Sequence, residues 1–129
     1  MKLGLGVVFA LFMSAGSVMA AAEVEGVWLS PPDNKGQTGH VVVRPCGAGF
    51  CGKLERAFDA NGKPITTKNV GKMLIRDMKP AKNGTYKGKA WVPLFDKTFD
   101  ATMSRKGNIL TIKGCAGPVC KSQLWTRIK

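Results

Sequence analysis

From residue 24 onward, hydrophobic and polar side chains alternate with a period of two, in short segments rich in β-branched residues. This period is typical of half-buried β-strands, and no apolar stripe with helical spacing competes with it. Turn-forming runs such as Asp59-Ala60-Asn61-Gly62 and Lys82-Asn83-Gly84 separate the segments. The pattern predicts eight strands: Val24–Leu29, Thr38–Arg44, Gly52–Phe58, Met73–Met78, Thr85–Val92, Thr98–Ser104, Ile109–Lys113 and Lys121–Ile128.

Eight short strands in one domain favour an all-β fold, arranged as a meandering barrel or sandwich. The long polar connection Asp59–Lys72 is expected to cover an open barrel end. For the fourth segment, alternation allows two solutions, with either Leu74 and Met78 or Met73 and Ile75 facing inward.

Residues 1–20 have the pattern of a cleavable signal peptide, in which Lys2 precedes the apolar run Leu3–Met13 and small residues end at Ala20. Cleavage after Ala22 fits the same pattern. The apolar run is about 11 residues, whereas a helix needs roughly 20 to cross a bilayer. We therefore expect a single exported domain, residues 21–129, in the periplasm or outside the cell, with no transmembrane segment.

The four cysteines form two pairs with identical spacing, each enclosing a glycine-containing turn of four residues. Cysteines that flank a short turn lie opposite each other across a β-ladder, at a distance that a disulfide can bridge. We therefore predict the disulfides Cys46–Cys51 and Cys115–Cys120. A four-cysteine zinc site is the alternative, but an exported chain meets an oxidising compartment, which favours disulfides.

Candidate catalytic and metal-binding residues are scarce. The only histidine is His40, and alternation places it on the outer face of its strand if Val41 and Val43 face inward. Without a base beside a nucleophile, serine or cysteine hydrolase chemistry is disfavoured. One histidine and oxidised thiols supply no metal site. The sequence therefore predicts no catalytic residues, no metal and no cofactor.

The sequence is strongly basic, with a formal charge of +12 that falls to +11 when Lys2 leaves with the signal peptide. Cations concentrate between Lys53 and Lys89, and Lys79, Lys82 and Lys87 are the candidate anion-binding residues. Such a field attracts anionic partners. Export favours an anionic envelope surface over nucleic acid, and a solvated basic face without a partner is the simplest alternative.

Several short motifs resemble known proteins. Gly26-Val27-Trp28 in the first segment and Trp125-Thr126-Arg127 in the last resemble the signature of the calycin and lipocalin superfamily. Across nearly the whole domain, further motifs resemble a family of small exported bacterial proteins, domain of unknown function 2147: Cys46, Cys51-Gly52-Lys53, Lys97-Thr98-Phe99, Lys113-Gly114-Cys115 and Gln123-x-Trp125-x-Arg127. The resemblance implies an eight-stranded antiparallel lipocalin-like (calycin) barrel and brings no established activity.

In that superfamily the first-strand Gly-x-Trp packs against a basic residue of the closing strand. The resemblance therefore assigns Gly26, Trp28 and Arg127 to a structural latch. A guanidinium on a partly desolvated indole face stabilises a fold by about 1–2 kcal/mol. We interpret the three residues as structural and not as ligand contacts.

An eight-stranded barrel is just wide enough to be filled by side chains or to hold one small ligand. Methionine and aromatic side chains form the adaptable walls that such ligands use. The candidate ligand-binding residues, each of which is also a natural core residue, are Met73, Ile75, Tyr86, Trp91, Phe99 and Met103. We expect a non-enzymatic protein that binds a small apolar or amphipathic ligand in the barrel. The alternative is a filled barrel that contacts the anionic envelope through its basic surface.

Overall fold

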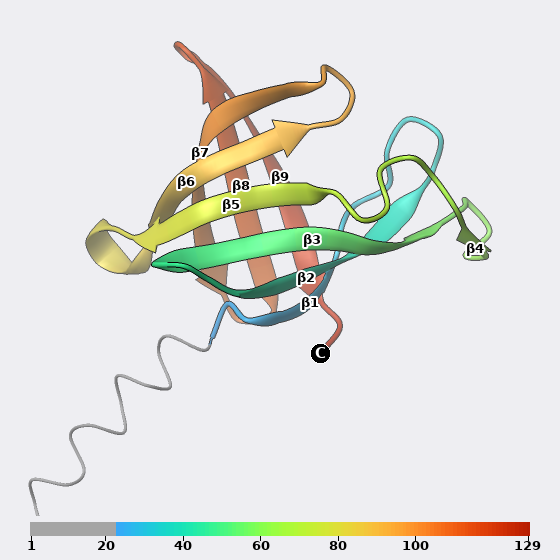
Figure 1. Ribbon diagram of the computed structural model, residues 1–129, viewed down its shortest axis with the longest axis horizontal. Helices are drawn as coiled ribbons and strands as arrows, with labels where there is room; N and C mark the ends of the chain where they lie inside the picture. The colour runs from blue at the N-terminus through green and yellow to red at the C-terminus, as the bar shows by residue number, and fades with distance from the viewer. Residues whose placement is uncertain (1–22) are drawn as a thin grey trace, which may run out of the picture.

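The structure is a computed structural model that describes residues 23–129 (Figure 1). The predicted signal peptide and both predicted cleavage positions, after Ala20 and after Ala22, lie outside the described residues. Among residues 23–129, no helix has the length and apolar character needed to span a bilayer.

All eight predicted strands are present, and several extend further than the sequence pattern predicted. The described chain also contains a short two-residue strand, β4, and a 3-10 turn, η2. The elements are β1 (Gly26–Leu29), β2 (Thr38–Cys46), β3 (Gly49–Phe58), β4 (Pro64–Ile65), β5 (Met73–Pro80), η2 (Lys82–Gly84), β6 (Tyr86–Val92), β7 (Lys97–Lys106), β8 (Ile109–Ala116) and β9 (Val119–Arg127).

The strands form a closed antiparallel barrel, which confirms the predicted fold class. Each strand pairs with its neighbour in the chain, except that β5 pairs with β3 and leaves β4 on the outside. The pairing of β1 with both β2 and β9 closes the ring. One end of the barrel carries the hairpin turns β2–β3, β5–β6 and β7–β8, and we call it the closed end because both chain termini of the described part pack there. The other end, with the turns β6–β7 and β8–β9, is called the open end.

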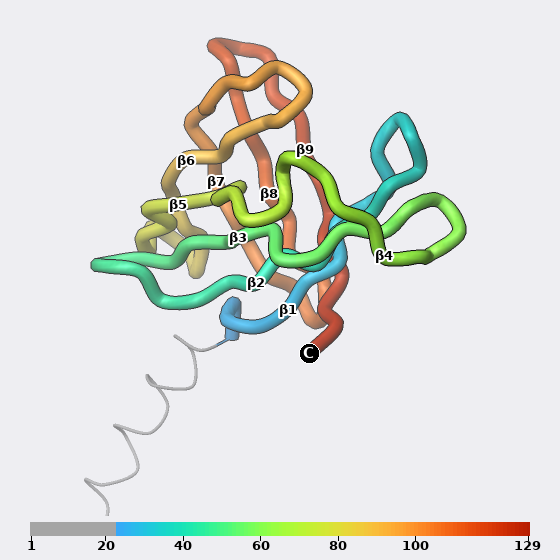
Figure 2. Tube along the Cα trace, turned by 45° about the vertical axis from the view of Figure 1, so that its right-hand side comes forward, coloured from blue at the N-terminus to red at the C-terminus, as the bar shows by residue number. Residues whose placement is uncertain are grey.

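The connection between β3 and β5 was expected to cover the open end, but only its last residues pack against the barrel. Val70 packs against the core, and the backbone of Gly71 and Lys72 is hydrogen-bonded to Leu54. The β4 turn instead projects away from the barrel beside the β1–β2 loop (Figure 2). Most of this polar segment is therefore exposed to solvent.

The seam between β1 and β9 is short. Only two residue pairs join the strands, Trp28 with Arg127 and Leu29 with Thr126, and Val27 adds hydrogen bonds to residues 128 and 129. Pro31 and Pro32 come one residue after the end of β1 and have no N–H to donate, so the chain cannot continue pairing along β9. Residues 119–125 of β9, in the described chain, pair with β8 alone.

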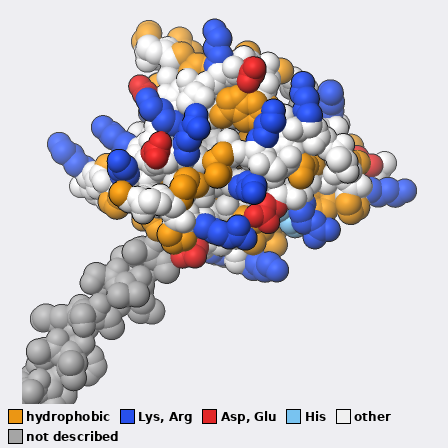
Figure 3. Space-filling model, viewed as in Figure 1, with side chains coloured by type: hydrophobic (Ala, Val, Ile, Leu, Met, Phe, Trp, Pro, Cys, Tyr) orange, Lys and Arg blue, Asp and Glu red, His pale blue; other side chains and the backbone are white. Residues whose placement is uncertain are grey.

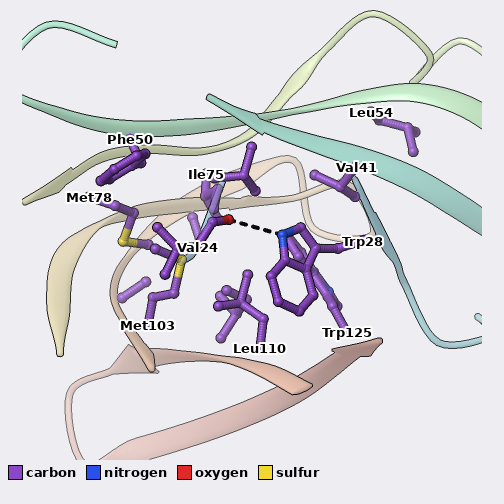
Figure 4. Packing of buried hydrophobic residues seen from close by; sticks show 14 residues of the cluster. Val24, Trp28, Val41, Phe50, Leu54, Ile75, Met78, Met103, Leu110 and Trp125 are labelled. Atoms are coloured by element: carbon purple, nitrogen blue, oxygen red, sulfur yellow. Dashed lines mark hydrogen bonds between the residues drawn. The ribbon is translucent and has the colours of Figure 1, made fainter. Parts of the chain in front are cut away.

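The barrel interior is filled by one cluster of fourteen buried side chains, shown in Figure 4. Trp28 is its largest fully buried member, and the indole N–H donates to the carbonyl oxygen of Val24 at 3.0 Å. Val41 and Val43 face inward as predicted, so His40 lies on the outer face of β2.

A bulge in β5 changes which of its side chains reach the core. Asp77 has a φ of 55°, and the register with β6 shifts between Arg76 and Lys79. As a result Ile75 and Met78 are both buried, whereas strict alternation allowed only one of them. Neither predicted inward set is complete. Met78 and the partly buried Leu74 of one set contact the core, and so does Ile75 of the other, because the irregular register of β5 interrupts its alternation.

Glycine on the neighbouring strand makes room for this bulge. A Cβ atom at Gly88 of β6 would lie 2.6 Å from the carbonyl oxygen of Asp77 and 2.7 Å from its carbonyl carbon. These are backbone atoms of the bulge and cannot rotate away. A side chain at position 88 would therefore push β5 and β6 apart.

Candidate functional site

At the seam, Arg127 of the last strand contacts residues of the first strand and of the segment before it. Its guanidinium carbon lies 4.3 Å from the centroid of the Trp28 ring, and the same group donates to the backbone carbonyls of Glu23 and Glu25. A Cβ atom at Gly26, where φ is 145°, would lie 2.7 Å from the Arg127 guanidinium. The structure therefore contains the contact that the latch interpretation requires, and Gly26 supplies the space for it.

Both predicted disulfides are present, and the described chain has no free cysteine. The Cα atoms are 5.6 Å apart in Cys46–Cys51 and 4.1 Å apart in Cys115–Cys120. The first closes the β2–β3 hairpin at the closed end, and the second closes the β8–β9 hairpin at the open end.

The interior ligand-binding candidates are packed in or beside the core, and neither of the two depressions described below reaches them. Ile75 and Met103 are fully buried members of the packed core. Tyr86 is partly buried and meets Phe50 edge-on at 5.7 Å between ring centroids, while Phe99 is partly buried near the open end. Two depressions on residues 23–129 lie on the outer surface of the barrel.

Met73 and Trp91, which were expected to line the interior, lie on the outer face. Met73 is 40% exposed and pairs with Lys53. Trp91 follows the buried Ala90 on β6, so its indole projects to the opposite side of the sheet. The interpretation of these two residues as barrel-lining is wrong. Trp91 has the outward parity of its strand, and the register of β5 with β3 shifts between Ile75 and Met73, so Met73 pairs with the exposed Lys53 and does not share the inner face with Ile75.

Met73 and Trp91 nevertheless come together in one of the two outer depressions. We call this the Trp91 depression, with a volume of about 340 Å³, and it is lined by Lys72, Met73, Arg76, Trp91 and Asp96. The Lys72 ammonium lies 5.2 Å from the Trp91 ring centroid, and the indole N–H donates to an Asp96 carboxylate oxygen at 3.0 Å. The Asp96 carboxylate thus fixes the edge of the Trp91 ring, and the Lys72 ammonium lies over one face of the same ring. An aromatic platform with cations beside it can bind an anion that has an apolar or planar part.

The candidate anion-binding lysines lie around the β5–β6 hairpin at the closed end. Lys79 stands opposite Lys87 in the ladder, and Lys82 lies in the turn between the strands. Like charges directly opposite each other disfavour the pairing. Within the described chain, neither Lys79 nor Lys87 forms an ion pair. Figure 3 shows lysine and arginine side chains spread over this side of the molecule, where they outnumber the acidic ones.

A second outer depression, of about 320 Å³, lies next to these lysines. Its lining comprises Lys87, Gly88, Asp100, Ala101, Thr102, Lys113 and Cys115. The Lys89 ammonium is hydrogen-bonded to Asp100, and this bond and the charge of Lys89 lower the pKa of the Asp100 carboxyl. Asp100 is thereby engaged with a neighbouring cation and stays ionised at neutral pH.

His40 lies on the outer face of β2, with its ring centroid 4.7 Å from that of Phe58. Burial first, and then the charges of Arg56 and Lys129, lower the pKa of His40. The unfolded chain, with an ordinary pKa of about 6.5, binds this proton more readily than the folded protein. The contribution of neutral His40 to the free energy of unfolding is therefore complete above that pH, and it is lost as the pH falls below it.

We therefore expect the free energy of unfolding to fall between pH 7 and pH 5, and the variant His40→Gln to lose part of this dependence. Urea melts of both proteins across this range measure the difference. His40 is the only histidine, so the comparison isolates one group. Identical slopes in the two proteins would contradict the assignment.

Residues 23–129 contain no group of three or more histidine, cysteine, aspartate or glutamate side chains placed to hold a metal ion. Sequence reasoning had not singled out Lys72, Arg76 or Asp96 as site residues. A signal was available for Asp96, because Phe95-Asp96-Lys97 is typical of a turn and comes shortly after Trp91.

Comparison with known proteins identifies the family of this chain. A family model described as "Uncharacterized protein conserved in bacteria (DUF2147)" matches residues 26–127, almost all of the described chain. The chain belongs to the DUF2147 family. This membership confirms the resemblance found in the sequence motifs.

A solved structure similar to this DUF2147 chain is described as "Protein HP1028 from the human pathogen Helicobacter pylori belongs to the lipocalin family". The two share 17% identity with a TM-score of 0.60, over 83% of this chain and 84% of the other. Comparison with curated protein sequences gives no match. The structural neighbour supports a lipocalin-like barrel fold.

Proposed function

We propose that this DUF2147 protein is an exported, non-enzymatic binding protein of the periplasm, and that its ligand is a small amphipathic anion held in the Trp91 depression. The signal-peptide pattern and the two disulfides support export. The observation that carries the proposal is the placement of Met73 and Trp91 beside Lys72 and Arg76 in one depression.

The lining divides into two kinds of surface. Trp91 and Met73 offer an apolar wall, against which a planar or aliphatic part of a ligand can lie. Lys72 and Arg76 are exposed, and among the described residues neither forms an ion pair, so both can contact an anionic group. The volume of about 340 Å³ falls in the range of small-molecule sites.

The outer surface is favoured over the barrel interior because the interior is occupied. Fourteen apolar side chains pack between the strands, and Trp28, Val41, Val43, Met78 and Leu110 have no exposed surface. Protein cores are close-packed, and admitting a ligand would require these side chains to move. The proposal therefore keeps the ligand class expected from the sequence and changes its location.

Titration with 8-anilinonaphthalene-1-sulfonate, an aromatic anion, tests the proposal. We expect one saturable site per chain, and about a tenfold loss of affinity in each of the variants Trp91→Ala and Arg76→Gln. A tenfold change corresponds to about 1.4 kcal/mol, a usual value for a central aromatic or arginine contact.

Two further variants serve as controls. Lys106→Gln removes an exposed cation at the closed end of β7 and is expected to leave the affinity unchanged. Phe99→Ala alters the inner face near the open end and should also have little effect. If Phe99→Ala weakens probe binding while Trp91→Ala does not, the ligand enters the barrel and the proposed site is wrong.

A further inference from the structure

Two hairpin tips at the open end expose apolar side chains. On the β6–β7 turn, Leu94 is 72% exposed and Phe95 is 57% exposed, and Val119 at the β8–β9 turn is 63% exposed. Figure 1 and Figure 2 show both turns at the top of the barrel. Two projecting apolar tips on one end of a small domain point to a surface that they contact.

The β6–β7 tip is held in a defined conformation. The N–H of Phe95 donates to the carbonyl of Val92, and that of Asp96 donates to Pro93, each at 3.2 Å. Asp96 has a φ of 49° and accepts the hydrogen bond of the Trp91 indole. The Phe95 ring meets Phe99 edge-on, with 6.5 Å between centroids. Local bonds thus keep Leu94 and Phe95 at the tip instead of letting them fold back onto the barrel.

A lysine stands behind each tip. Lys97 follows Phe95 by two residues and Lys121 follows Val119 by two residues, and both lysines are exposed. Val119 and Lys121 both lie in β9, where two residues span about 7 Å, and Lys97 is the first residue of β7 after the turn that holds Phe95. Within residues 23–129, neither lysine forms an ion pair. Each tip therefore exposes apolar side chains, and an unpaired lysine lies next to them on the side toward the barrel.

We propose that the open end docks on an anionic lipid bilayer, with Leu94, Phe95 and Val119 inserted at the surface and Lys97 and Lys121 at the lipid phosphates. Peripheral segments bury apolar side chains about 5–10 Å into the headgroup boundary, which matches the spacing between Val119 and Lys121. Anionic lipids attract cations that lie close to the surface. A second copy of this chain is a poorer occupant, because it would bring the same cations face to face.

This docking surface is distinct from the Trp91 depression, since none of the three tip residues lines it. The two proposals can therefore fail separately. The protein binds the anilinonaphthalene probe through the depression whether or not the tips contact lipid.

Co-sedimentation with vesicles of phosphatidylglycerol and phosphatidylethanolamine tests the docking. We expect the double variant Leu94→Ser/Phe95→Ser to bind at least tenfold more weakly, while its affinity for the probe stays unchanged. Leu124→Ser is the matched control, because Leu124 is 56% exposed but lies on the outer wall of β9, away from the tips. Its binding should equal that of the wild type, and vesicles of phosphatidylcholine alone should bind the wild type weakly.

Two charge variants with equal net charge locate the contact. Lys97→Gln/Lys121→Gln neutralises the open end, and Lys79→Gln/Lys87→Gln neutralises the closed end. We expect the first pair to reduce vesicle binding at least five times more than the second. The proposal is overturned if the closed-end pair has the larger effect, if the tip variant binds vesicles like the wild type, or if sedimentation velocity shows a dimer that the tip variant abolishes.

Discussion

Replacing Trp28 with alanine is expected to lower the free energy of unfolding by about 3–5 kcal/mol, the usual cost of deleting a large buried aromatic side chain. The indole is fully buried, bonds to Val24 and carries Arg127 on its face, so no neighbour can fill the space without breaking the seam. Domains of this size have a total stability of about 5–15 kcal/mol. The variant should therefore be close to unfolding at 37 °C, as urea melts followed by circular dichroism will show.

Trp91→Ala is the matched control for this variant. It deletes the same side chain from the outer face, where Trp91 is only partly buried, and is expected to cost less than about 1 kcal/mol. Arg127→Ala should fall between the two, because it removes the cation above Trp28 but leaves the indole in the core. Equal losses for Trp28→Ala and Trp91→Ala would refute the structural role given to the first-strand tryptophan.

Adding a single methyl group at Gly88 is the second change with a large expected effect. Its Cβ atom would collide with the backbone of the β5 bulge at distances of 2.6–2.7 Å, and overpacking of this kind costs about 1–3 kcal/mol. The loss arises although alanine suits a strand better than glycine does. Thermal and urea melts of Gly88→Ala measure it.

Gly114→Ala provides the comparison within the same sheet. A Cβ atom there would have its nearest neighbours at 3.9 and 4.0 Å, which is ordinary contact, and Gly114 has no positive φ. Replacing this glycine is expected to be neutral or stabilising by about 0.5 kcal/mol, since alanine loses less backbone freedom on folding. If both alanine variants are equally stable, the bulge does not depend on the missing side chain at position 88.

The alternating pattern was sufficient to predict the strands and the all-β class, because the residues of each β-strand alternate between its two faces, whereas the choice of a barrel over a sandwich came from the resemblance to a known family. In β2, for example, Val41 and Val43 alternate with His40 and Val42, and the two inward positions are fully buried. The cysteine spacing was equally informative, since two cysteines around a four-residue turn are brought together by the hairpin itself. These signals are local and need no knowledge of the rest of the chain.

The candidate site was harder to predict, because it depends on parity and on contacts between strands. Lys87 and Lys89 share the parity of Trp91, and two lysines on one face already indicate that this face is the outer one. Trp91 was nevertheless predicted to lie inside, because its aromatic side chain was given more weight than the parity that it shares with the two lysines. Met73 could not be placed in the same way, because its outward position depends on an irregular register between β5 and β3, in which Ile75 pairs with Gly52 and Met73 pairs with Lys53.

The short seam between β1 and β9 also bears on the order in which the barrel assembles. Trp28 meets Arg127 about a hundred residues later in the chain, whereas most other strands pair with the strand next in sequence. Pairing of sequence-distant segments carries the larger loop-closure cost and is the slow part of folding. Hairpins between neighbouring strands can form one after another from the N-terminus. The contacts of Trp28 with β9, in contrast, cannot form until residues 127–129 are present. We therefore expect ring closure, which uses Arg127, Ile128 and Lys129, to be the final folding event.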